Sequence, residues 1–265
     1  MKGGFLGLFR ALAAALFILT IPVALITTNI RVAVSEQRVY DYAVREHGAA
    51  DVSGIAESEL IRANGEIRSY LTADEAGPLA ISVQTESDST VRLFSARETA
   101  HMADVRDLVQ SLFTVQIASV LAALTLAVML IAWSLPRVLA AAALCGSLLT
   151  GGLLAAAGIV AASGFDSAWT EFHVVAFSND FWQLDPSRDH LIQMFPEAFW
   201  FEITSVIVVV TLLEAVLISG DAAGYLILTR PREVAPYSPP APEVAGPAGH
   251  SRPKLARPNP RHYFR

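Results

Sequence analysis

Long apolar blocks without charged residues are the feature that most constrains how this chain can fold. No Asp, Glu, Lys or Arg occurs in three stretches, residues 11–30, 108–136 and 138–165. Each stretch reaches or exceeds the roughly 20 apolar residues that cross a bilayer as a helix. A fourth block, residues 196–228, is similarly apolar over most of its length. The sequence therefore predicts an integral membrane protein with four spanning helices.

The positions of Lys and Arg beside these blocks predict the orientation of the chain. Basic residues near the ends of spans mark the cytoplasmic side of a membrane protein. Residues 166–202, from the end of the third block into the start of the fourth, instead hold seven acidic residues and one basic residue, Arg188. We therefore expect both termini in the cytoplasm and two polar loops outside. The basic residues that support this orientation are Lys2, Arg10, Arg137, Arg230 and Arg232.

The apolar blocks divide the chain into seven predicted segments. No small-residue cleavage site follows the first block, so we expect an uncleaved membrane anchor rather than a signal peptide. The Pro-rich tail cannot bury a core and is predicted to be disordered. The segments are the N-terminus with the first span (1–30), an extracytoplasmic loop domain (31–107), the second span (108–136), the third span (137–165), an extracytoplasmic aromatic and acidic loop (166–195), the fourth span (196–229) and the cytoplasmic tail (230–265).

The loop between the first two spans carries signals for both helices and strands. Residues 32–47 and 55–71 show apolar side chains at helical spacing. Residues 79–84 and 90–94 are short β-prone runs on either side of a polar turn, which predicts a small hairpin. The expected fold class is a mainly α membrane protein, with four transmembrane helices and a small α+β extracytoplasmic domain.

A capping box precedes the second span. Ser95 supplies a hydroxyl at the cap and Glu98 a carboxylate three residues later, so a helix should begin here and continue unbroken into the membrane. On this helix Arg97, His101 and Asp104 are spaced by three and four residues, which places them on one face. A rigid helix that continues into a span would hold these side chains in a fixed position.

The loop between the third and fourth spans is dense in aromatic residues. Asp185 and Pro186 predict a helix start, with the acid as cap and the proline at the first helical position, and a short helix to about Met194. Aromatic side chains gather at membrane–water interfaces. We expect such a belt from Trp169, Trp182, Phe195, Phe199, Trp200 and Phe201.

Three histidines, His101, His173 and His190, fall on the predicted outer face, where an imidazole is well suited to move protons. His190 follows two charged residues and is expected on a polar helix surface. One interpretation of the other two is that they are amphipathic side chains lodged at the interface. Each is accompanied by an acid, Asp104 or Asp180, so the alternative is that they converge on one site at lipid headgroup depth. No HExxH or other close ligand pair favours a metal, so neither metal nor cofactor is expected.

Two segments of the loops carry a longer pattern. Residues 94–106 read FSARETAHMADVR. The second loop holds, in order, Phe172-His173, Phe177, Asn179-Asp180, Trp182, Leu184-Asp185-Pro186, Asp189, Leu191-Ile192 and Phe195-Pro196. The first segment resembles the REIxHMxDVK segment of a family of bacterial membrane proteins that includes the lipoprotein intramolecular transacylases (Lit), and the second resembles that family's other segment. The resemblance extends over four spans and both loops, roughly residues 5–228, and leaves out the tail.

The resemblance implies transfer of the sn-2 acyl chain of an S-diacylglyceryl-cysteine lipoprotein to the α-amino group of the same cysteine. The expected partners are the diacylated lipoprotein and membrane lipids, with no nucleic acid. Because the substrate is its own nucleophile, the protein needs no serine elbow, and no GxSxG motif occurs. His101 and His173 are expected to act as general base and as proton donor, in an order that stays open. Expected supporting residues are Asp104 and Asp180 for orienting the imidazoles, Asn179 for the oxyanion, and Arg97 for a headgroup or backbone carbonyl.

Two other functions fit the same sequence. A non-catalytic scaffold or sensor of the same family would bind a partner through its loop domain and would not need His101 and His173 to meet. A transporter is suggested by Glu214 and Asp221, which share a helix face inside the fourth span, where acids usually mark function. Both acids are expected in the inner half of the span, within reach of cytoplasmic water. Four spans without an internal repeat also argue against transport.

Overall fold

Four long helices make up most of the computed structural model, which describes residues 2–85, 89–133, 136–162 and 164–231. They are α1 (Lys2–Ser35), α5 (Ala96–Trp133), α6 (Pro136–Ala162) and α9 (Glu197–Leu228). All four are long and apolar enough to cross a membrane. A small strand pair accompanies them, so the predicted fold class, mainly α with four spanning helices and a small α+β domain, is confirmed. The tail predicted to be disordered lies outside the described residues from residue 232 onward.

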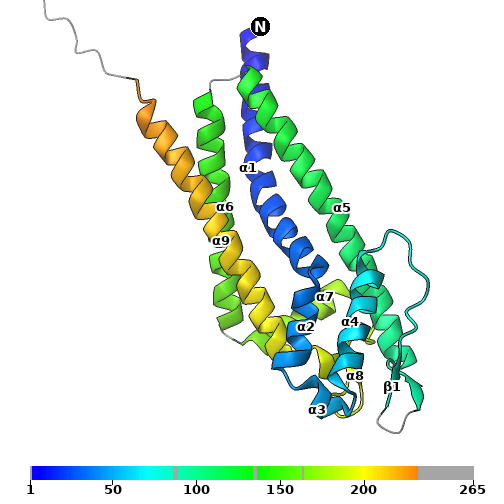
Figure 1. The fold of residues 1–265 in the computed structure, drawn as a ribbon. Helices are drawn as coiled ribbons and strands as arrows, with labels where there is room; N and C mark the ends of the chain where they lie inside the picture. The colour runs from blue at the N-terminus through cyan, green and yellow to red at the C-terminus, as the bar shows by residue number, and fades with distance from the viewer. Residues whose placement is uncertain (1, 86–88, 134–135, 163, 232–265) are drawn as a thin grey trace, which may run out of the picture. The chain divides into compact units, whose positions relative to one another are not determined.

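The helix α1 occupies the centre of the bundle and packs against α5, α6 and α9 (Figure 1). Its contact with α6 is close because Gly146 has no side chain. A Cβ at Gly146 would lie 2.6 Å from Cδ1 of Ile21 and 3.0 Å from the carbonyl oxygen of Ile18. Pro22 lies within α1 and lacks an N–H, so it cannot donate a hydrogen bond to the preceding turn of the helix. Small residues at such contacts are how spanning helices approach each other closely.

Polar side chains join α1 to its neighbours within the bundle. The Asn29 amide donates to Glu214 Oε2 at 2.7 Å and to Thr211 Oγ1 at 3.0 Å, both on α9. On the side facing α5, Arg31 Nη1 donates to Gln116 Oε1 at 2.9 Å. Acids inside spans usually pair with another polar group. These contacts give Glu214, one of the two acids that suggested transport, a structural role between α1 and α9.

The loop domain lies between α1 and α5 in the chain. It contains the helices α2 (Gln37–Glu46), α3 (Ala49–Ser53) and α4 (Glu57–Thr72), then the strands β1 (Ser82–Gln84) and β2 (Thr90–Arg92). The strands pair antiparallel, and the hairpin predicted from the sequence is present. Its expected turn includes residues 86–88, which lie outside the described residues.

The single helix expected over residues 32–47 is divided in two. The first helix of the chain continues to Ser35, and a new helix begins after Glu36. The Glu36 backbone is extended, and its side chain accepts a hydrogen bond from Arg38 N at 3.3 Å. Apolar spacing persists across this bend, so helical periodicity alone could not locate it.

The core of the loop domain extends onto the start of α9 and onto the short helix α8 (His190–Met194). Phe195 and Phe199 are buried in this core together with Tyr40 and Leu60. The prediction that these two phenylalanines belong to the aromatic belt at the outer membrane interface is therefore wrong. Burial in protein removes their apolar area from water, which favours this position energetically.

The side chains of α5 anchor the C-terminal end of α4. Arg106 donates from Nε to the Tyr70 carbonyl at 3.0 Å and from Nη2 to the Ala73 carbonyl at 2.7 Å. Gln110 Nε2 donates to the Leu71 carbonyl at 2.7 Å and, more weakly, to Ala73. The last carbonyls of a helix have no partner within the helix, so these donors satisfy groups that would otherwise be unpaired. One spanning helix thus holds the loop domain in place.

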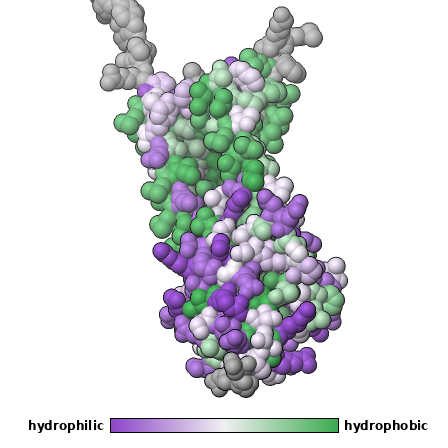
Figure 2. All heavy atoms as spheres, turned by 45° about the vertical axis from the view of Figure 1, so that its right-hand side comes forward, coloured by the Kyte–Doolittle hydropathy of each residue, from purple (hydrophilic) through white to green (hydrophobic). Residues whose placement is uncertain are grey.

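The surface divides into two zones along the bundle. Figure 2 shows hydrophobic side chains over one end of the long helices and mostly hydrophilic side chains over the loop domain. We predict that reporters fused after Gly164, or inserted within residues 51–54, will report the outer face of the membrane, whereas a fusion at Arg137 will report the cytoplasm. Paired alkaline phosphatase and fluorescent protein fusions measure this. A cytoplasmic signal at Gly164 would contradict the proposed orientation.

Candidate active site

Two buried histidines from different helices meet beside the loop domain. His101 lies near the start of α5, and His173 lies on α7 (Phe165–Ala176). Their ring centroids are 6.0 Å apart, and each residue is only 7% exposed. The structure thus brings together the pair that the sequence analysis singled out, while their catalytic roles stay a prediction. The helix α7 was not foreseen, because its residues were interpreted as part of a loop.

Hydrogen bonding fixes the tautomer of His173. Its Nδ1 lies 2.7 Å from the carbonyl oxygen of Trp169, one turn earlier on α7. A carbonyl oxygen can only accept, so Nδ1 carries the hydrogen and Nε2 is left as an acceptor in the neutral ring. Burial lowers the pKa of His173 below its ordinary value, and the bond to Trp169 opposes this only partly. At neutral pH the ring is therefore an uncharged base.

Aromatic rings surround the two imidazoles. The Phe177 ring lies 5.1 Å from that of His101, in an edge-to-face arrangement. Trp200 of α9 stacks on Trp169 at 5.0 Å and supports it from behind. Such a wall excludes water and strengthens electrostatic interactions inside the site. The rings nearest His173 are Trp169 (4.7 Å), Trp182 (5.0 Å), Phe172 (5.2 Å) and Phe177 (5.6 Å).

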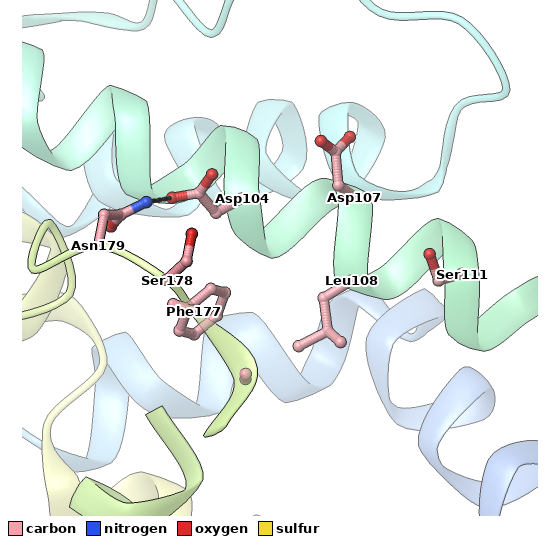
Figure 3. A pocket seen from close by; sticks show the side chains of 8 residues that line it. Asp104, Asp107, Leu108, Ser111, Phe177, Ser178 and Asn179 are labelled. Atoms are coloured by element: carbon pink, nitrogen blue, oxygen red, sulfur yellow. Dashed lines mark hydrogen bonds between the residues drawn. The ribbon is translucent and has the colours of Figure 1, made fainter. Parts of the chain in front are cut away.

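A pocket of about 250 Å³ opens between α5 and the segment at the end of α7 (Figure 3). Phe177 lines it and also contacts both imidazoles, so one ring separates the pocket from the histidines. Two carboxylates, of Asp104 and Asp107, are part of its wall, and no basic side chain lines it. The lining residues are Asp104, Asp107, Leu108 and Ser111 of α5, with Ala176, Phe177, Ser178 and Asn179 at the end of α7 and beyond.

The four expected supporting residues join α5 to the segment that follows α7. Asn179 Nδ2 donates to Asp104 Oδ2 at 2.9 Å. Arg97 donates to the backbone carbonyl of Asp180 and pairs with its carboxylate at 3.7 Å. The acids were expected to orient the imidazoles, but these contacts are made to Asn179 and Arg97 instead. Arg97 lies one turn before His101 and Asp104 lies one turn after it. Their contacts therefore hold the segment that contains Phe177 against the site.

Glu98 has a second partner that the sequence did not reveal. Its Oε2 accepts from Ser95 N at 2.7 Å, which is one half of the predicted capping box. Its Oε1 accepts from Leu191 N at 2.7 Å, at the far end of the second loop, and the residue is only 1% exposed. Extreme burial of a capping residue is a signal of such a partner, but burial cannot be read from local sequence.

The end of the second loop differs from its prediction. Asp185 Oδ1 accepts from Ser187 N at 2.9 Å and from the Ser187 hydroxyl, which closes a turn rather than starting a helix. The helix begins only at His190, after Asp189. His190 Nδ1 donates to the Leu93 carbonyl at 2.8 Å, so it is a structural contact and not a free side chain on a polar surface.

No arrangement of three or more His, Cys, Asp or Glu side chains suited to a metal ion occurs within the described ranges. The two histidines instead face each other with aromatic rings around them. Among the described residues His101 Nδ1 is buried and has no hydrogen-bond partner. A buried polar atom without a partner calls for an explanation, and binding of a substrate atom supplies one.

Comparison with known proteins places this site in a family. The family model of lipoprotein intramolecular transacylase Lit matches residues 15–200 of the 265. The chain is similar to a solved structure of Bacillus cereus Lit, with a TM-score of 0.71 and 21% identity over 84% of this chain and 97% of that one. Two variants of that protein, each with one histidine replaced, align with TM-scores of 0.69 at 21% identity, over 86% of this chain and 96% and 98% of theirs.

No match was found among curated proteins. At 21% identity the structural likenesses establish the fold, including the four spanning helices of a membrane protein. The match to the family model covers well over half of the sequence and includes both histidines of the site. The chain therefore belongs to the lipoprotein intramolecular transacylase Lit family, a family of membrane enzymes.

Proposed function

We propose that this protein moves the sn-2 acyl chain of an S-diacylglyceryl-cysteine lipoprotein to the α-amino group of that cysteine. The product is an N-acyl, S-monoacylglyceryl lipoprotein. The observation that carries the proposal is the pair of buried imidazoles 6.0 Å apart, held on two helices within an aromatic wall. Acyl transfer to an amine needs a base and a donor close together, and this pair supplies both.

His173 is proposed as the general base. An α-amino group has a pKa near 8, so the ammonium form first loses one proton to water to give the free amine, and the amine loses a second proton as its nitrogen attacks. His173 Nε2 accepts this second proton while Nδ1–H remains bonded to Trp169. The amine nitrogen forms a bond to the ester carbonyl carbon, and the carbonyl electrons move onto oxygen. The imidazolium then gives the proton to the glycerol oxygen as the ester C–O bond breaks, so the base is regenerated.

His101 is proposed to stabilise the oxyanion. A neutral imidazole can donate one N–H to a developing negative charge, and in a water-excluded site such a bond is worth more than in water. The His101 ring lies within the same aromatic wall as His173, and its Nδ1 has no partner among the described residues. No covalent intermediate with the protein is needed, because nucleophile and acyl donor both belong to the substrate.

The pocket beside the pair suits the amine end of the substrate. The amine arrives mostly as a cation, and Asp104 and Asp107 line the pocket without any basic side chain. Attraction by these carboxylates would hold the ammonium group in the pocket, where the Phe177 ring lies between it and His173. We further propose that the site faces the outside of the bacterial cytoplasmic membrane and that both termini are cytoplasmic. The lipoprotein substrate is anchored in the outer leaflet of that membrane.

The test uses purified protein in liposomes with a synthetic diacylglyceryl-cysteine lipopeptide. Intramolecular transfer leaves the total mass unchanged, so tandem mass spectrometry must locate the acyl chain. We expect fragments with an N-acylated cysteine and a mono-acylated glycerol, and no exchange between light and deuterated substrates mixed together. A lipopeptide with an acetylated amine is the control and should not react. If correctly inserted protein leaves the free-amine lipopeptide unchanged, a non-catalytic role within the family is favoured.

A further inference from the structure

Two hydrogen bonds join the segment before His101 to the end of the second loop. Glu98 Oε1 accepts from Leu191 N at 2.7 Å, and His190 Nδ1 donates to the Leu93 carbonyl at 2.8 Å. We call this pair of contacts the latch. Its partners are about a hundred positions apart in the sequence, and Glu98 and Leu191 are buried. The latch therefore fixes the position of one chain segment relative to another.

Each side of the latch leads to one of the two imidazoles. On α5, His101 follows Glu98 by three residues of rigid helix. On the other side α8 leads to Phe195, whose carbonyl accepts from Trp200 Nε1 at 3.0 Å. Trp200 stacks on Trp169, and the Trp169 carbonyl holds His173. An unbroken series of contacts therefore runs from His101 through the latch to His173.

Glu98 is more deeply buried than helix capping requires. The reciprocal capping contact with Ser95 uses one carboxylate oxygen, and such caps usually lie at the surface. Here the residue is 1% exposed, and no ion pair to Glu98 occurs in the described part of the chain. Burial of a carboxylate is costly unless its oxygens are hydrogen-bonded, and both are used. The second oxygen serves the contact with Leu191.

We infer that Glu98 and His190 are positioning residues for acyl transfer, because the latch they form sets the spacing between His101 and His173. This inference rests on the proposed function for its kinetic consequence, while its structural consequence can be measured on the histidines directly. Loss of the latch lets the end of the second loop move away from α5. The aromatic wall around His173 then loosens, since Trp200, near the start of α9, is hydrogen-bonded to Phe195 of that segment.

The test compares isosteric changes that break the latch with changes that spare it. Glu98→Gln keeps the shape of the side chain but places an amide NH₂ group against one of the two backbone N–H groups that the carboxylate accepts from, so two donors face each other. His190→Ala removes the donor to the Leu93 carbonyl. Ser95→Ala weakens only the cap, and His190→Asn keeps a donor at the position of Nδ1. Because displacement of about 1 Å can cost up to 10²-fold, we expect the first two variants to lower kcat about 10- to 100-fold with KM little changed. The two sparing variants should stay near wild type.

A second readout distinguishes positioning from general instability. Burial keeps the pKa of His173 below its ordinary value, so protonation of this ring should lower the wild-type rate only below about pH 6.5, whereas protonation of the substrate amine, with a pKa near 8, lowers the rate equally in every variant. In Glu98→Gln and His190→Ala water reaches the ring, its pKa rises, and the acid limb moves to higher pH. Nuclear magnetic resonance of labelled histidines should show the same shift without any substrate.

The outcomes separate this inference from the proposed function. If the wild type transfers no acyl chain but Glu98→Gln still raises the pKa of His173, the latch stands and the proposed function fails. If Glu98→Gln and His190→Ala keep wild-type kcat and histidine titration, the latch inference is overturned. It is also overturned if Ser95→Ala causes the same loss and shift as Glu98→Gln. Should Glu98→Gln not insert, the comparison of His190→Ala with His190→Asn decides.

Discussion

His101→Ala and His173→Ala are each expected to lower the rate of acyl transfer by about 10²- to 10⁴-fold, the range typical of general acid–base groups. His173→Ala removes the acceptor for the amine proton, and His101→Ala removes the N–H proposed to face the oxyanion. The rings lie 6.0 Å apart in one site. Single-turnover rates of N-acyl lipopeptide formation, read by tandem mass spectrometry, measure both losses.

The double variant and a matched control make this prediction sharper. Groups that act on the same step are not additive, so the double variant should lose far less than the product of the two single losses. His47→Gln is the control, because glutamine can keep the donor that His47 Nε2 offers to Glu202 at 3.2 Å. The site would be misassigned if His101→Ala retained full activity or if His47→Gln matched the two active-site variants.

Arg106→Ala is expected to lower the free energy of unfolding by about 3 kcal/mol, since each hydrogen bond to a charged group contributes roughly 1.5–3 kcal/mol. The guanidinium donates to the carbonyls of Tyr70, Ala73 and Asp74 at the end of α4. Without it the Tyr70 and Asp74 carbonyls lose this donor, and Gln110 still holds that end of the loop domain through Leu71 and Ala73. Reversible denaturation in detergent micelles, followed by tryptophan fluorescence, measures the change.

Two other substitutions show whether geometry or charge matters at Arg106. Arg106→Lys keeps the charge but has one compact donor group, so it should recover only part of the loss. Arg38→Ala removes an arginine whose side chain is 93% exposed and should change stability by less than about 0.5 kcal/mol. An Arg106→Ala protein as stable as Arg38→Ala would show that α5 does not anchor the loop domain through this residue.

The parts of the fold that the sequence predicted depend on local or strongly periodic signals. The four spanning helices follow from apolar blocks that have no other stable solution in a bilayer. The start of α5 follows from Ser95 and Glu98, whose reciprocal contacts are formed as expected. The juxtaposition of His101 and His173 was proposed because both sit at the ends of spans, and the family resemblance reinforced it.

The parts that were missed depend on contacts between distant residues or on ambiguous local chemistry. Asp185-Pro186 suits a helix start and a turn equally well, because both use an acid that accepts from a nearby N–H. The second carboxylate oxygen of Glu98 accepts a hydrogen bond from Leu191 N, a contact that no local sequence pattern reveals. Likewise Asp104 and Asp180 found partners in Asn179 and Arg97, although their types would have suited contacts with imidazoles.

The unbroken helix α5 connects the site rigidly to a membrane-spanning segment. Its 38 residues extend about 57 Å at 1.5 Å per residue, roughly twice the hydrocarbon thickness. His101 lies near one end of this helix, while His173 lies on α7, which does not span the membrane. A long helix adapts to bilayer thickness by tilting. We therefore expect lipid chain length to alter the distance between the two imidazoles, and the rate of acyl transfer in liposomes to depend on bilayer thickness.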